Sequence, residues 1–277
     1  MKTTIRLIFA IILILSMLTD CKKKEGEAPV LPPAESMSID FSNFENDNKS
    51  AGVELPKGVE NSNWEFSALV AGYFRSIITS TLAVPVAAFK VAVDQTPVYL
   101  SSRTWQWSFN ASVMSVTYKA RLTGQIRTSD VEWKMYIARE GTGAFDEFLW
   151  FEGTSSLDGS SGQWTLYHSY TYQEPVLQID WTKSGTSVGS VKYTYVRALN
   201  DSRAADPFKN SYIEYGKTTG TLDAYYNIYY YNGVGFSTMN VQWSTTGHNG
   251  SVVCEDFFGD SDPHCWDGNY VNVTCSK

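Results

Sequence analysis

The 277-residue sequence contains little charge, few cysteines and almost no histidine. Charged residues make up 18% of the chain, the formal net charge is -7, and there are 4 cysteines and 3 histidines. With 14% aromatic residues, this composition is typical of a folded chain and not of a disordered one. The acidic balance excludes nucleic acid from the expected partners, because binding to phosphates needs a basic surface.

Motifs that would mark an enzyme are also missing. The only histidines are His168, His248 and His264, and no Gly-x-Ser-x-Gly elbow accompanies them, so a Ser-His-Asp triad has little support. No glycine-rich loop follows a predicted strand and opens a helix, which excludes a phosphate-binding loop. The sequence therefore predicts no catalytic residue, no cofactor and no enzyme activity.

One group of carboxylates offers a weaker, catalytic alternative. Asp146, Glu147 and Glu152 surround Trp150, and glycosidases use paired carboxylates beside aromatic rings. On a single strand, however, Glu147 and Glu152 would face opposite sides. Asp146 and Glu152 would lie roughly 20 Å apart at about 3.3 Å per residue. A hydrolase would need a partner carboxylate from another strand.

Three cysteines lie close to the C-terminus, at Cys254, Cys265 and Cys275. They lack the closely spaced pairs of a zinc site, and the acidic loop at 256–267 lacks the order of an EF-hand, so we expect no metal. Outside the cytoplasm a disulfide is the better expectation. If residues 251–255 pair with 270–274, Cys254 would bond either Cys275 or Cys265.

The N-terminus has the pattern of an export signal. Lys2 and Arg6 precede an apolar run, Leu7 to Leu18, that is too short for a membrane span and ends in Leu18-Thr19-Asp20-Cys21. This ending resembles the lipobox of bacterial lipoproteins. The resemblance implies a signal peptide at 1–20 and lipidation of Cys21, which would then hold the protein on the membrane. An ordinary signal peptide or an uncleaved anchor is the alternative.

A tether follows the cysteine. Residues 22–27 are charged and residues 28–33 are rich in proline, so we expect 21–36 to be an extended spacer. Such a tether resembles lipoproteins of the Bacteroidota type. Lys22 directly after the cysteine implies, by the same resemblance, the outer membrane, on its periplasmic or its cell-surface face. Residues 37–277 are expected to form a single β-rich domain.

One unit is written twice in the middle of the chain. Residues 133–136 and 164–167 both read Trp, any residue, Met or Leu, Tyr, and each is followed by a further tryptophan, Trp150 or Trp181. The apolar residues of both units alternate with a period of two, which is typical of strands. A turn-rich segment at 157–162 separates them. We interpret the units as successive hairpins of an antiparallel meander.

A single apolar helix is predicted at 63–84. Its apolar residues recur at steps of three and four, Ser62 or Asn63 can cap it, and Pro85 is expected to end or kink it. Only Arg75 is charged between Phe66 and Phe89, so we expect burial on more than one side. A membrane span is the weaker alternative.

The predicted fold is mainly β. It is a single large curved antiparallel meander or half-barrel of about a dozen strands, with the one apolar N-terminal helix packed on its concave side. The predicted strands centre on 105–109, 116–122, 131–137, 147–151, 164–172, 176–181, 191–195, 212–215, 222–231, 239–243, 251–255 and 270–274.

Aromatic residues exceed what one core needs. We hypothesise that they bind or carry a hydrophobic, lipid-like small molecule in a cavity of a non-catalytic envelope lipoprotein. The alternatives are a surface protein that stacks glycans on exposed rings, and a structural or interaction protein whose rings only fill a wide sheet. The candidate ligand-binding residues are Trp105, Trp107, Trp133, Trp150, Trp164, Trp181, Tyr226 and Tyr230.

Overall fold

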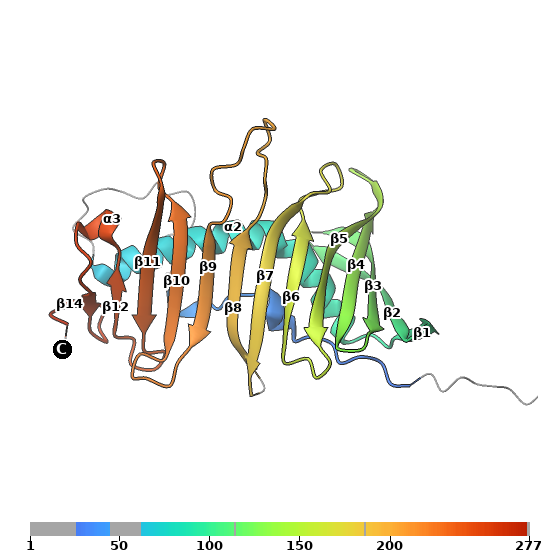
Figure 1. The fold of residues 1–277 in the computed structure, drawn as a ribbon, viewed down its shortest axis with the longest axis horizontal. Coiled ribbons are helices and arrows are strands. Elements are labelled where there is room, and N and C mark those ends of the chain that lie inside the picture. The colour runs from blue at the N-terminus through green and yellow to red at the C-terminus, as the bar shows by residue number, and fades with distance from the viewer. Residues whose placement is uncertain (1–25, 45–61, 114, 186, 276–277) are drawn as a thin grey trace, which may run out of the picture.

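The computed structural model describes residues 26–44, 62–113, 115–185 and 187–275, which build a mainly β structure (Figure 1). Its centre is one open sheet of 14 strands that lie side by side in chain order. Every neighbouring pair of strands is antiparallel, so the predicted meander is confirmed. The predicted signal peptide and Cys21 lie outside the described residues.

The sheet contains two more strands than the twelve that were predicted. The pattern missed β1 and β13 because strands of three or four residues are too short to show a period. It also extended β6 to residue 172, whereas β6 ends at Tyr167 and the chain then turns. The strands are β1 Val98–Ser101, β2 Thr104–Val113, β3 Val116–Ile126, β4 Asp130–Arg139, β5 Phe145–Ser156, β6 Ser161–Tyr167, β7 Pro175–Ser184, β8 Ser187–Tyr195, β9 Tyr212–Lys217, β10 Ala224–Tyr231, β11 Phe236–Trp243, β12 Gly250–Val253, β13 His264–Trp266 and β14 Asn272–Val273.

The two sequence units correspond to two hairpins, β4–β5 and β6–β7. Their closing tryptophans are not equivalent. Trp181 pairs directly with Gly162 and is buried. Trp150 occupies a β-bulge, because Met135 pairs with Phe151 while the next residue of β4 pairs with Leu149. The extra residue leaves Trp150 half-buried at the edge of the core.

Tryptophan and glycine alternate in a row across the inner face of the sheet. Trp105 of β2 pairs with Gly124 of β3, which also pairs with Trp133 of β4. Trp133 pairs with Gly153 of β5, and Gly153 with Trp164 of β6. A Cβ atom on Gly153 would lie 2.1 Å from the carbonyl oxygen of Gln163 and 2.6 Å from the Trp164 ring. These glycines therefore make the space in which the indoles lie flat on the sheet.

Helix α2, Asn63–Val93, crosses behind the sheet from β12 and β13 to β2 (Figure 1). The Ser62 hydroxyl accepts a hydrogen bond from the Glu65 amide, and the Glu65 carboxylate accepts one from the Ser62 amide. This capping box confirms the predicted start. The prediction of an N-terminal helix is not confirmed, because the described segment 26–44 precedes α2. It also continues nine residues past the predicted end at 84.

Pro85 kinks the helix and does not end it. The halves Asn63–Thr79 and Thr81–Val93 meet at 64°. Pro85 has no amide hydrogen for the Thr81 carbonyl, and its ring clashes with that carbonyl one turn earlier, where the bend lies. Among the described helices, none alone is long and apolar enough to cross a membrane; the two halves of α2 qualify only together.

The expectation that α2 is buried on several sides is wrong for its middle. Gly72, Tyr73 and Arg75 are exposed, and the Tyr73 side chain keeps 52% of its surface in contact with solvent. The two ends of α2 are buried instead, at Trp64 and Phe66 and again at Phe89. The helix is therefore held firmly where it meets the two ends of the sheet and less closely between them.

The N-terminal segment fills the space between α2 and the central strands. The short 3-10 turns η2, Ala34–Met37, and η3, Ser42–Phe44, contact the helix, and η2 also contacts β7 and β8. Met37 is fully buried, and the Trp164 indole donates a hydrogen bond to the Ser36 hydroxyl. Packing against the core already begins at Ala28, inside the segment predicted as a tether.

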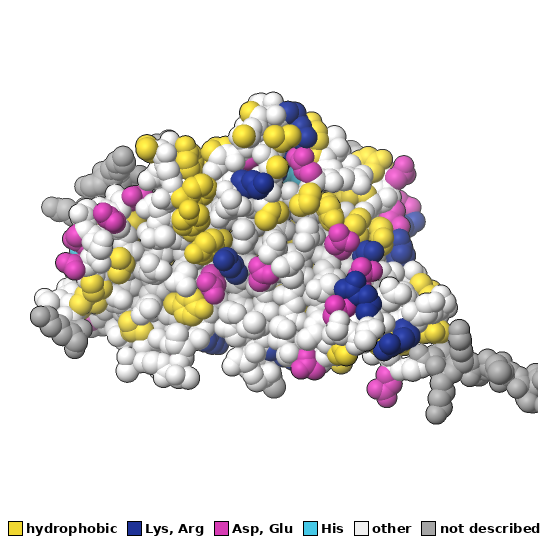
Figure 2. All heavy atoms as spheres, viewed as in Figure 1, with side chains coloured by type: hydrophobic (Ala, Val, Ile, Leu, Met, Phe, Trp, Pro, Cys, Tyr) yellow, Lys and Arg dark blue, Asp and Glu magenta, His cyan; other side chains and the backbone are white. Residues whose placement is uncertain are grey.

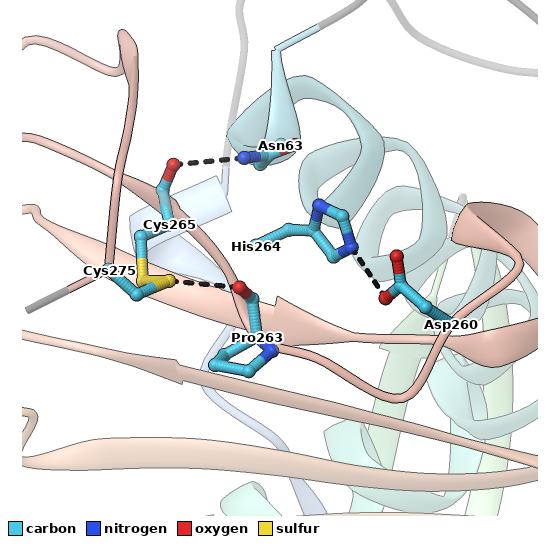
Figure 3. Close-up of a disulfide and its surroundings, with 6 residues drawn as sticks. All are labelled: Asn63, Asp260, Pro263, His264, Cys265 and Cys275. Carbon is cyan, nitrogen blue, oxygen red and sulfur yellow. Dashed lines mark hydrogen bonds and ion pairs between the residues drawn. A yellow bond between two sulfur atoms is a disulfide. The ribbon is translucent and has the colours of Figure 1, made fainter. Parts of the chain in front are cut away.

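One disulfide closes the C-terminal end of the sheet. Cys265 of β13 is bonded to Cys275, while Cys254 is a buried free thiol. Both predicted pairings with Cys254 are wrong, because β13 lies between β12 and β14 and places Cys265 next to the last strand. The Asn63 side chain donates a hydrogen bond to the Cys265 carbonyl, which ties the start of α2 to this corner (Figure 3).

Replacing Gly153 by alanine is expected to lower the free energy of unfolding by about 1–3 kcal/mol, because the new methyl group collides with backbone and indole. Gly72 is the matched control. It lies in α2 with open space around it, so Gly72→Ala should raise the free energy of unfolding by up to about 1 kcal/mol. Urea denaturation of both full-length variants measures this. Equal effects of the two changes would contradict the packing described for the Trp–Gly row.

Thiol labelling tests the disulfide. In the full chain carrying Cys21→Ser, we expect no maleimide uptake while the protein is folded and one label per chain after denaturation without reductant. Cys254 resists labelling because only 2% of it is exposed and burial raises the pKa of its thiol. Three labels on the denatured, unreduced chain would rule out the Cys265–Cys275 bond.

Candidate functional site

The aromatic residues proposed from the sequence lie on the inner face of the sheet. All eight are buried in the core except Trp150 and Tyr230, which are half-buried at its edge. Their rings contact one another and the chain's own helix and N-terminal segment; Trp164, for example, packs edge-on against Phe89 of α2. A ligand-binding role for these residues stays a prediction.

The described residues leave little room between α2 and the sheet. A hollow lined by Phe44, Trp64, Trp243 and Trp266 is too narrow to admit a water molecule. Phe44 fills most of this region, since its ring meets the Trp243 ring edge-on with centroids 4.9 Å apart. A lipid-like ligand here would require the helix or the N-terminal segment to move away from the sheet.

The outer face of the sheet is open and carries a stack of rings over β8–β11. The Lys192 ammonium lies 3.9 Å from the centroid of Tyr212. Tyr212 stacks on Tyr229 at 5.6 Å, and Tyr229 stacks on Phe236 at 4.7 Å with a 9° angle between planes. Hydrophobic side chains gather in this region in Figure 2. The ring faces cover one another, so a sugar would find mainly ring edges here and no flat platform.

The carboxylates around Trp150 are engaged in contacts of their own. Glu147 forms an ion pair with Arg121, and the Tyr167 hydroxyl donates a hydrogen bond to Glu152 at 2.6 Å. Burial and this carboxylate raise the pKa of Tyr167 to about 12, so the phenol stays protonated and keeps donating. Asp146 is exposed. These three carboxylates do not converge on a common point as a glycosidase pair would.

The described histidines and cysteines have other contacts. His264 pairs with Asp260 and stacks on Phe258 near the disulfide (Figure 3), and His168 contacts Ser169. Within the described part of the chain, no group of three His, Cys, Asp or Glu side chains could hold a metal ion.

A polar pocket opens at the ends of β2, β3 and β4, and we call it the rim pocket. It has a volume of about 390 Å³, within the range usual for small-ligand sites. It lies at the start of β3 and the end of β4, so its residues lie at the same end of these neighbouring strands. Acidic and basic side chains gather on the neighbouring outer face, over β3–β5, in Figure 2. The rim pocket is lined by Asn110, Ser115, Val116, Thr117, Lys119, Arg139, Glu140 and Thr142.

Arg139 is the unusual residue of the rim pocket. It is the last residue of β4 and continues the inward-facing series of Trp133, Met135 and Ile137. Its Nε atom is buried and has no hydrogen-bond partner among the described residues. A buried donor without a partner destabilises a fold by about 1–3 kcal/mol. Such a group in a pocket is suited to receiving an acceptor from a ligand.

Gly143 brings the loop after β4 close to this guanidinium. A Cβ atom on Gly143 would lie 3.1 Å from Nη1 of Arg139, and the residue has a φ of 73°, which favours glycine. Lys119, also in the lining, forms an ion pair with Glu140 at 2.5 Å, and both of these side chains are exposed. The remaining polar lining consists of one amide and three hydroxyl groups, all able to donate and accept hydrogen bonds.

Arg197 shows how this chain satisfies a buried arginine elsewhere. Only 6% of its side chain is exposed, yet it forms ion pairs with Glu174 and Asp201. Glu174 is shared with Arg203, and the two guanidinium groups lower the pKa of that carboxyl. This network fixes the long loop between β8 and β9. One nitrogen of Arg197, Nη2, still lacks a well-aligned hydrogen bond, but Arg139 has no carboxylate partner at all among the described residues.

No family model, curated protein or solved structure matches this chain. Function is therefore inferred from the geometry of its own residues.

The rim pocket was not predicted from the sequence. Its signal was present, since a positive charge stands at position 139, on the parity that is apolar at 131, 133, 135 and 137. The other lining residues gave no signal. Asn110, Thr117 and Thr142 are common on outer faces and in loops, and only the register of β2, β3 and β4 brings them together.

Replacing Arg139 by methionine is expected to leave the melting temperature unchanged or raise it, because the change removes a buried donor that has no partner. Arg197→Met is the matched control and should lower stability by about 1–3 kcal/mol, since it removes the ion pairs of Arg197 with Glu174 and Asp201. Thermal unfolding followed by circular dichroism compares them. A large loss of stability in Arg139→Met would mean that Arg139 is a structural residue.

Proposed function

We propose that this chain is a lipid-anchored, non-catalytic protein of the bacterial outer membrane that binds a saccharide in the rim pocket. The observation that carries the proposal is a ligand-sized pocket, lined mainly by polar residues, that includes an arginine whose Nε atom has no hydrogen-bond partner among the described residues. The hydroxyl and amide groups of the lining match sugar hydroxyls, which likewise both donate and accept.

The direction of the N-terminal segment supports an outward-facing pocket. Pro29 lies against Gly124 near the end of β3, and Val30 lies against Gly159 in the turn between β5 and β6. The pocket residue Thr117 lies at the other end of β3, about 23 Å away at 3.3 Å per residue. Cys21 precedes Gly26 by five residues, so a lipid on it could lie at most about 18 Å from Gly26. The anchor would therefore hold the end of β3 that lies opposite the pocket toward the membrane.

The finer features predicted from the sequence belong to this proposal. They are signal-peptide cleavage before Cys21, lipidation of that residue, and curvature of the sheet into a half-barrel around α2. In such a half-barrel the helix and the N-terminal segment would serve as the filling of the concave side. The carrier hypothesis remains a prediction, but the inner face is occupied by Met37, Phe44 and Phe89, and the rim pocket is the better supported site.

Binding of glycans by the full chain in detergent tests the proposed function. We expect saturable binding to a subset of an array of bacterial and host glycans, with loss of binding in Thr117→Trp, which fills the pocket from an exposed position. Phe236→Ala, at the outer ring stack, is the control and should bind normally. Absence of binding to every glycan, or equal loss in both variants, would overturn the proposal.

Membrane attachment is tested separately. The wild-type chain should fractionate with the outer membrane and incorporate radiolabelled palmitate, whereas Cys21→Ser should do neither. Replacing Cys254, which lies buried beside Tyr230, should leave palmitate incorporation unchanged. Label in the Cys21→Ser variant would disprove lipidation at this residue.

A further inference from the structure

We propose that the rim pocket selects saccharides that carry a carboxylate, with the Arg139 guanidinium as the group that binds the carboxylate. This inference rests on the proposed function and names the ligand class of the same site. It concerns only the charge of the sugar and leaves saccharide binding itself as a separate question.

The first argument is the state of Arg139. A guanidinium presents parallel N–H groups that match the two oxygens of a carboxylate. Among the described residues the Nε atom of the half-buried Arg139 has no acceptor and its guanidinium has no carboxylate partner, whereas the buried Arg197 pairs with two carboxylates. Because Arg139 lines the rim pocket, a carboxylate that binds there could pair with its guanidinium.

The second argument is charge balance. The ionisable lining residues are Lys119, Arg139 and Glu140, with formal charges of +1, +1 and −1, which leave +1. Glu140 already neutralises Lys119, so Arg139 carries the excess. One positive charge matches a singly charged carboxylate. A phosphate monoester, close to doubly charged at neutral pH, would leave one negative charge uncompensated in the pocket.

The third argument is how the polar groups are distributed around this charge. Asn110 and Thr117 come from β2 and β3, whereas Thr142 comes from the loop after β4. The polar groups therefore come from several elements, as hydroxyl groups spread around a sugar ring require. Val116 adds one apolar contact. A carboxylate ligand without hydroxyls, such as a peptide C-terminus, would leave these groups without a role.

Titration calorimetry on the full chain in detergent compares defined ligands. The acidic probes are digalacturonate and the N-acetylglucosamine–N-acetylmuramic acid disaccharide, which stand for two sources of the same chemistry, exported polysaccharide and peptidoglycan. The neutral probes are galactobiose and N,N′-diacetylchitobiose. We expect at least one acidic probe to bind about tenfold to hundredfold tighter than its neutral counterpart, the value expected for a charge-assisted pair. Whichever acidic probe binds identifies the source.

Variants locate the carboxylate. Arg139→Met should lower affinity for the acidic probe to that of the neutral one, and Arg139→Lys should restore only part of it, because an ammonium cannot bind both oxygens. The control is Arg103→Met, which changes an exposed arginine in the turn between β1 and β2, at the end of β2 that lies away from the pocket. This variant should bind as wild type. Raising the salt concentration from 50 to 500 mM should weaken the acidic probe alone.

Equal affinity for acidic and neutral probes, with both bound, would overturn the selectivity and leave saccharide binding standing. Failure of all four sugars, together with a negative array, would overturn both proposals. Tighter binding of an acetylated tripeptide with a free C-terminus than of any sugar acid would also overturn the inference, because the carboxylate would then act without the hydroxyls.

Discussion

The contact of tryptophan with glycine across neighbouring strands is the constraint on which the sheet depends. An indole lying flat on a sheet needs a neighbour without a side chain, since any Cβ atom would occupy the same space. The row that starts at Trp105 and ends at Trp164 meets this need by alternating large and small residues over five strands. The same arrangement recurs near the C-terminus, where Gly250 lies between Trp243 and Trp266. Because a shift of one residue would place an indole against a side chain, the alternation also fixes the register of the strands.

A flat layer of indoles still has to be covered on its other side, and this need explains the helix and the N-terminal segment. A sheet of 14 strands is too wide for one helix lying along it. Helix α2 instead crosses the sheet, and the kink before Pro85 lets both halves reach their strands. The segment with Met37 and Phe44 fills what remains. The core is therefore closed by parts of the chain that lie far from the sheet in sequence.

Much of this could be predicted from the sequence. The period of two gave the meander, the unit around Trp133 and Trp164 gave its hairpins, and Ser62 with Glu65 gave the start of α2. Other features depend on long-range contacts. Gly250 belongs to an Asn-Gly pair typical of turns, yet it begins β12 because Trp266 needs the space. The disulfide partner of Cys265 depends on β13, a strand too short to show a pattern. The extent of α2 past Pro85 depends on the packing of Phe89 against Trp164.

The candidate site also could not be predicted from the sequence. Sequence reasoning turned to the aromatic surplus, and the structure uses those rings to build its core. The rim pocket is made of residues that are ordinary one by one and become a site only through strand register. Arg139 is the exception, since it breaks the apolar alternation of β4 at its last position. A break of a local rule that has no compensating contact is a functional signal, because it lowers stability without helping the fold. Arg139 lies at the end of a strand, where the core opens to solvent. There the loss of stability is small enough for the fold to tolerate, and the side chain remains accessible to a ligand.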